Sequence, residues 1–144
     1  MKHAFAALVF AAFSGAALAQ MTPVGAWQTV DDKTGEVKSQ IRIADNGGAL
    51  SGRIEKVLRK DAKADALCDE CVDDRKGKPM VGLELIRGGR KADGKEVWEG
   101  GKILDPENGK EYRASYTPVD GGRKLEVRGY LGPFWRTQTW NRVQ

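Results

Sequence analysis

The sequence has little of what catalysis usually requires. It contains one histidine in 144 residues, His3, and that residue lies in a segment that reads as a cleaved leader. A mature chain without histidine cannot form Ser-His or Cys-His triads, use imidazole as a general base, or bind metal through imidazole. The remaining residues form no catalytic motif that we recognise. We therefore predict a protein that is not an enzyme and needs no cofactor.

Long apolar runs and clustered basic blocks are also absent. No segment reaches the ~20 apolar residues needed to cross a bilayer as a helix, so we expect no transmembrane segment. The formal net charge is +4, and the densest basic block is the short stretch Arg87–Lys91. Nucleic-acid binding requires basic residues gathered on one face, so we expect no nucleic-acid partner.

The N-terminus has the three parts of a secretory signal. Lys2 supplies the positive charge, residues 4–13 form a short apolar run, and Ala17-Leu18-Ala19 is a small-x-small cleavage site. We predict a signal peptide over residues 1–19 and one mature domain over residues 20–144. The mature protein is then expected to be soluble and periplasmic or secreted.

Two cysteines, Cys68 and Cys71, form a Cys-x-x-Cys in the stretch ALCDECVDD. An oxidising compartment favours a disulfide. A redox centre would need cations to lower the thiol pKa, yet the neighbouring charges between Asp65 and Asp74 are all acidic. A zinc site would need two carboxylates as further ligands, which is an uncommon set. We predict a structural Cys68–Cys71 disulfide and no metal, with metal and redox roles as the alternatives.

The mature chain consists of short segments rich in β-branched and aromatic residues, separated by turn sequences such as DNGG and DPENGK. Alternation of apolar and polar residues, as at Ile41 and Ile43 against Arg42, indicates one buried face per strand. Short connections between serial strands are typical of an up-and-down barrel. We predict an all-β, eight-stranded antiparallel barrel, with strands at residues 24–31, 36–44, 49–58, 80–88, 96–104, 110–119, 124–132 and 134–143.

One connection, Arg59 to Lys78, is much longer than the others and contains both cysteines. A helical turn around KDAKADAL is one possibility. Long connections are uncommon unless they carry a function or move. The connection could therefore cover one end of the barrel, or be a solvated crossover without a ligand role.

Gly25-Ala26-Trp27 at the first strand and Arg142 at the last resemble the signature of calycins, the superfamily of lipocalins. There, a late arginine packs on an early tryptophan, an arrangement that gains cation–π energy. The ordered motifs SGRIEKV, CDEC, VGLELIRG, GKILDPENGK and VRGYLG also resemble a bacterial envelope family known as domain of unknown function 2147. The resemblance covers residues 24–143 and implies a lipocalin-like barrel, but it implies no reaction.

Four polar side chains are candidates for orienting a ligand inside the barrel: Tyr112, Tyr116, Arg128 and Arg136. An arginine beside tyrosines suits a carboxylate such as that of a fatty acid. We predict a binding protein for a small hydrophobic or amphipathic ligand. The alternative is a barrel filled by its own side chains, including Trp98 and Trp140, that serves as a structural module or binds an envelope protein.

Two further hypotheses concern other residues. Hydrolysis or isomerisation by carboxylates such as Glu84, Glu99 or Asp105 is a third possibility, but no spacing selects an acid–base pair. Phe134 and Trp135 follow a Gly-Pro turn on opposite faces of a strand. One of them is expected outside, where it would either contact a partner or membrane surface or be ordinary surface apolarity.

Overall fold

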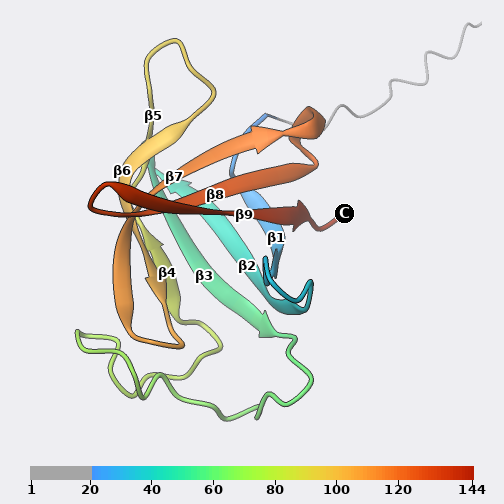
Figure 1. The fold of residues 1–144 in the computed structure, drawn as a ribbon, viewed down its shortest axis with the longest axis vertical. Helices are drawn as coiled ribbons and strands as arrows, with labels where there is room; N and C mark the ends of the chain where they lie inside the picture. The colour runs from blue at the N-terminus through green and yellow to red at the C-terminus, as the bar shows by residue number, and fades with distance from the viewer. Residues whose placement is uncertain (1–20) are drawn as a thin grey trace, which may run out of the picture.

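A computed structural model describes residues 21–144; the predicted signal peptide lies outside this range. The fold consists of nine β-strands and one short 3-10 turn, η1 (Asp120–Gly122) (Figure 1). The strands are β1 (Gly25–Val30), β2 (Val37–Asn46), β3 (Ala49–Val57), β4 (Glu84–Arg87), β5 (Arg90–Lys91), β6 (Trp98–Asp105), β7 (Lys110–Val119), β8 (Lys124–Leu131) and β9 (Phe134–Arg142).

The strands close into one antiparallel barrel. Their order is β4-β3-β2-β1-β9-β8-β7-β6-β5, and β4 also pairs with β6, which joins the two edges. Both β4 and the two-residue β5 pair with β6, so they act as one strand interrupted at Gly88 and Gly89. The prediction of an eight-stranded antiparallel barrel is confirmed.

The strand interruption sits where two backbones meet. Gly101 on β6 faces the Gly88–Gly89 backbone so closely that a Cβ atom on Gly101 would lie 2.3 Å from the Gly88 carbonyl carbon. No side chain fits in that space. A glycine inside a strand commonly marks such a close approach of two backbones, and this one allows β4 and β6 to meet and seal the barrel.

Trp27 and Arg142 close one end of the barrel. The Arg142 guanidinium carbon lies 4.2 Å from the centre of the fully buried Trp27 ring. Arg142 also donates hydrogen bonds to the carbonyl oxygens of Thr22, Val24 and Gly122. Gly25 is required beside it, since a Cβ there would lie 2.5 Å from an Arg142 nitrogen. Burial lowers the pKa of Arg142, and the three carbonyls and the indole face compensate for the lost water.

The half of the barrel next to this end is filled with side chains. Trp27, Ile43, Leu50, Tyr116 and Leu125 are almost completely buried there and belong to one apolar cluster. The Tyr116 hydroxyl has no hydrogen-bond partner among the described residues, and burial raises its pKa. This half of the barrel is therefore a packed core.

The segment from residue 58 to 83 is the longest connection, and it crosses the opposite end of the barrel, along the bottom of the view in Figure 1. It contains turns and an isolated bridge between Leu67 and Pro79. The helical turn expected around KDAKADAL is not formed, because residues 60–66 contain only two isolated turns, at 60–61 and 64–65. Within residues 21–144, no helix has the length and apolar character needed to cross a membrane.

Gly101→Ala is expected to lower the free energy of unfolding by about 1–3 kcal/mol, because its methyl group must displace the Gly88 backbone. Gly129→Ala is the matched control: it lies inside β8, and its nearest contact would be an ordinary 3.6 Å to the Tyr112 side chain. Urea denaturation of both variants measures the difference. Equal stabilities would contradict the assigned role of Gly101.

Candidate functional site

A cavity of about 780 Å³ occupies the barrel end opposite Trp27 and Arg142. The strand pattern explains its position. Along β9, alternate side chains face inward, and Phe134, Arg136, Gln138 and Trp140 all line the cavity. Arg142, two residues further along, belongs to the closed end. The cavity therefore extends from the middle of the barrel to its open end.

The floor of the cavity is apolar. Five deeply buried side chains from five different strands form it: Ile54, Leu85, Leu104, Val127 and Trp140. The Trp140 indole N–H donates to the Gln138 side-chain oxygen at 3.2 Å, so this nitrogen is not left unpaired against the apolar floor. A mainly apolar pocket of several hundred Å³ with a few polar groups is typical of small-molecule binding sites.

The mouth of the cavity carries charges of both signs. Three of its four cations, Lys38, Arg59 and Arg136, are in ion pairs, and Lys63 forms none within residues 21–144. Lys38 lies 2.9 Å from Asp31 and 3.3 Å from Glu107, and Arg59 also contacts Glu107. The Lys38 hydrogen bond lowers the pKa of Asp31, so this carboxyl is ionised at neutral pH. The mouth is thus a ring of ion pairs rather than a cationic funnel.

Arg136 belongs to this ring through Asp32. Its Nε donates to an Asp32 carboxylate oxygen at 2.7 Å, and a second guanidinium nitrogen contacts the other oxygen. This pairing lowers the pKa of Asp32 and raises that of Arg136. Because the Asp32 carboxylate already neutralises the guanidinium through two of its nitrogens, Arg136 offers a ligand only its remaining N–H donors and no uncompensated charge.

The first part of the long connection forms one wall of the mouth, where Arg59, Asp61, Ala62, Lys63 and Ala66 line the cavity. The rest of this connection is fixed to the barrel at two points. The first is the disulfide, and the second is the side chain of Arg75.

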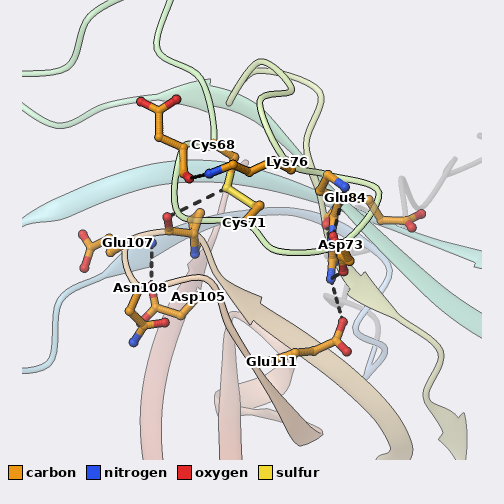
Figure 2. Close-up of a disulfide and its surroundings, with 12 residues drawn as sticks. Cys68, Cys71, Asp73, Lys76, Glu84, Asp105, Glu107, Asn108 and Glu111 are labelled. Atoms are coloured by element: carbon orange, nitrogen blue, oxygen red, sulfur yellow. Dashed lines mark hydrogen bonds and ion pairs between the residues drawn. A yellow bond between two sulfur atoms is a disulfide. The ribbon is translucent and has the colours of Figure 1, made fainter.

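The disulfide between Cys68 and Cys71 confirms the predicted pairing, and both residues are fully buried. Figure 2 shows it packed against the turn between β6 and β7, near Glu107 and Asn108. At the contact, Gly109 has a φ of 73°, and a Cβ there would lie 1.8 Å from the Glu70 carbonyl oxygen. A glycine is needed both for this φ and for the close approach.

Arg75 is the second point, with a side chain that is 1% exposed. Its guanidinium donates to Asp73 at 2.5 Å, to Glu111 of β7 at 2.7 Å and to the backbone carbonyl of Glu84 in β4 at 2.9 Å. One side chain therefore ties the connection to two strands that are distant in sequence. The Arg75 hydrogen bonds hold the pKa of the Asp73 carboxyl well below its usual value.

The structure brings two of the four predicted ligand residues to the cavity, Tyr112 and Arg136. The other two lie elsewhere. Arg128 points to the outer face of the barrel, where it stacks on Trp135 and donates to Thr137. Tyr116 is buried in the filled half and does not line the cavity. Arg128 and Tyr116 are therefore placed wrongly by the prediction.

The three carboxylates considered for catalysis do not come together. Glu84 pairs with Arg53 and Arg87. Glu99 and Asp105 lie at opposite ends of β6, about 20 Å apart at ~3.3 Å per residue. Within residues 21–144, no group of three His, Cys, Asp or Glu side chains is arranged to hold a metal ion.

Arg75 is the residue that sequence reasoning missed; the Arg59–Lys78 connection was considered as a cover for one barrel end, but none of its individual lining side chains was named. Arginine is seldom fully buried, so nothing in its position within VDDRKGK marks it as an anchor. The one available signal was the acidic pair Asp73 and Asp74 directly before it. Its more distant partner, Glu111, is set by the fold and cannot be read from the local sequence.

Comparisons with known proteins agree with this architecture. Residues 25–142 match the family described as "Uncharacterized protein conserved in bacteria (DUF2147)", and the chain belongs to that family. Among solved structures, the chain is similar to one described as "Protein HP1028 from the human pathogen Helicobacter pylori belongs to the lipocalin family". The two chains are 18% identical, with a TM-score of 0.71 over 88% of this chain and 84% of the other. This likeness shows a lipocalin-like fold. No curated protein matches the sequence.

Arg75→Met is expected to lower the free energy of unfolding by about 2 kcal/mol, because it removes charge-assisted hydrogen bonds from a buried group. Arg87→Met is the control, since Arg87 is partly exposed and pairs with the exposed Asp74; it should cost less than ~1 kcal/mol. Chemical denaturation measures both. The assigned anchor role is wrong if Arg87→Met costs as much as Arg75→Met.

The pH dependence of the stability of Asp73→Asn tests the same Asp73–Arg75 ion pair. A carboxyl whose pKa is lowered on folding stabilises the protein above its unfolded pKa, near 3.8, and this contribution is lost as pH falls toward the folded pKa. The stability difference between wild type and Asp73→Asn should therefore be constant near neutral pH and shrink below about pH 4. In the Arg75→Met background the difference should be small at every pH. A difference that grows on acidification would contradict this.

Proposed function

We propose that this DUF2147 protein binds and carries a small, partly apolar molecule in the open half of its barrel. The observation that carries the proposal is the cavity itself. It has a volume of about 780 Å³, a floor of buried apolar side chains, and polar groups confined to its mouth. This division supports a ligand with an apolar body and a polar head.

The charges at the mouth indicate whether the polar head of the ligand is charged or uncharged. Lys38, Arg59 and Arg136 are all neutralised by carboxylates within the protein. Lys63, the fourth cation of the lining, forms no ion pair within residues 21–144, but the carboxylates of Glu36, Asp61 and Asp105 line the same cavity and offset its charge. A fatty-acid carboxylate would therefore enter a mouth that already carries as many acidic as basic side chains, whereas hydroxyl or ester groups can share the existing donors and acceptors. The ion-pair ring therefore supports an uncharged polar head, with Tyr112 and Gln138 as further hydrogen-bonding groups.

The proposed compartment is the periplasm or the exterior of the cell. The leader pattern of residues 1–19 supports this proposal. The disulfide adds to it, because a buried Cys68–Cys71 bond persists where thiols are oxidised. A carrier of poorly water-soluble molecules is useful in such an aqueous compartment.

The alternative, a filled barrel that acts as an interaction module, fits only half of the structure. The side chains around Trp27 and Tyr116 do fill the closed half, but the open half holds the cavity. An envelope protein partner of the Arg59–Lys78 connection stays a prediction. Binding rather than catalysis is the role we propose, since the considered carboxylates lie apart.

Gly129→Leu is expected to weaken ligand binding strongly while leaving the fold intact. Gly129 lines the cavity, and a Cβ there makes only an ordinary contact at 3.6 Å, so a longer side chain extends into free space. Titration with a fluorescent monoacylglycerol should show at least about tenfold weaker binding than in wild type, because the added atoms occupy volume that the ligand needs.

Thr139→Leu is the control for this experiment, because it enlarges an exposed outward position on the neighbouring strand β9 and should not change binding. A fatty acid with the same chain should bind wild type no more tightly than the monoacylglycerol. Equal binding by wild type and Gly129→Leu would contradict the cavity as the site. Much tighter binding of the fatty acid would contradict the uncharged head.

A further inference from the structure

The hairpin of β8 and β9 exposes more large apolar surface than a barrel strand normally does. At its tip, Leu131, Phe134 and Trp135 are 63%, 74% and 62% exposed, and they flank the turn at Gly132 and Pro133. These three side chains also line the mouth of the cavity. The apolar tip is therefore continuous with the opening of the proposed binding site.

Aromatic and cationic side chains continue this surface along the outer face of the barrel. Tyr130 lies beside Trp135 across the β8–β9 pairing. The Arg113 guanidinium carbon lies 5.6 Å from the Tyr130 ring, and that of Arg128 lies 5.6 Å from the Trp135 ring. Among the described residues, neither Arg113 nor Arg128 forms an ion pair, so their charges face outward without an acidic partner.

The surface is free of acidic residues at its tip. No Asp or Glu occurs between Gly129 and the C-terminal Gln144. Farther from the tip, the outer faces of β7 and β8 carry Glu111 and Glu126, each two residues before one of these arginines, and Glu111 is paired with Arg75 and Lys102. Asp31 and Asp32, which precede β2, are neutralised by Lys38 and Arg136. The surface has the same order of layers as an anionic bilayer. The apolar tip matches the acyl chains, the amphipathic aromatic rings beside it match the interface, and the unpaired cations behind it match the phosphates.

We propose that the β8–β9 tip docks the barrel on bilayers that contain anionic phospholipids, with Phe134 and Trp135 in the interface and Arg113 and Arg128 against lipid phosphates. Docking in this orientation holds the cavity mouth at the membrane surface, where a partly apolar cargo can enter or leave. The docking surface goes beyond the proposed cargo site and does not require the cavity to be occupied.

Vesicle flotation tests this proposal directly. The full mature protein should float with phosphatidylcholine vesicles that contain phosphatidylglycerol and much less with phosphatidylcholine alone. Binding should weaken as salt rises, since the Debye length falls from ~10 Å at 0.1 M to ~3 Å at 1 M. Phe134→Ser combined with Trp135→Ser, and separately Arg113→Gln combined with Arg128→Gln, should each weaken binding by about tenfold or more.

Matched control variants distinguish the effect of this surface from the effect of removing an exposed apolar or charged residue elsewhere on the protein. Val72→Ser removes an 87% exposed apolar side chain from the long connection and should bind vesicles like wild type. Lys56→Gln with Lys95→Gln removes two exposed charges elsewhere and should have little effect. Gly129→Leu, which fills the cavity, should also dock normally, so that failure of cargo binding and failure of docking are distinguished.

Trp135 reports its own position, because the other three tryptophans, Trp27, Trp98 and Trp140, are buried. Vesicle binding should shift its fluorescence to the blue and expose it to quenching by brominated lipid; Trp135→Phe should lose this signal yet still float. The proposal is overturned by absence of flotation, by flotation that the tip variants leave unchanged, or by an unshifted Trp135. Equal binding to soluble dextran sulfate, independent of Phe134 and Trp135, would instead indicate a polyanion site.

Discussion

The hydrogen bonds of the buried Arg75 guanidinium determine the shape of the open end of this barrel. They connect Asp73 in the long connection with Glu111 on β7 and with the backbone of β4. Together with the Cys68–Cys71 disulfide, they hold the second part of that connection outside the barrel. The first part can then serve as a wall of the cavity instead of collapsing into it. Without these contacts we expect the connection to fold into the cavity, because protein interiors are close-packed and an unfilled apolar space is unfavourable.

The two ends of the barrel illustrate two uses of the same fold. At the closed end, Arg142 on the Trp27 indole and a layer of large side chains seal the interior. At the open end, β8 carries the small inward groups Val127 and Gly129, and a volume remains between them and larger lining side chains such as Tyr112 and Trp140. Lipocalin-like barrels of eight strands are wide enough for either outcome.

Much of the fold could be predicted from the sequence because strand alternation and turn residues are local signals. The expected strand at 124–132 is observed as β8 (Lys124–Leu131), and the expected strand at 110–119 as β7. The segment expected as strand at 80–88 is strand only over Glu84–Arg87. There the chain first turns at Gly82, whose φ is 89°, before it joins the sheet.

The site was less predictable, for physical reasons that differ by residue. Alternation along β8 puts Leu125 and Val127 inside and therefore Arg128 outside. The prediction that Arg128 lies in the cavity went against this alternation. Tyr116 does face inward, but local alternation does not show how far along the barrel a side chain lies. Arg136 reaches the mouth as expected, yet its partner Asp32 comes from a distant loop, and only the closed barrel brings the two together.

The central claim is that the open half of the barrel holds a small, partly apolar molecule. Native mass spectrometry of the mature protein, secreted through its own leader and purified without detergent, tests it most directly. The account predicts a bound mass in the lipid range that is released on collisional activation, and a polypeptide two hydrogens lighter than the reduced chain because of the disulfide. A mass that is only that of the protein, and that stays so after incubation with a lipid extract, would contradict the account.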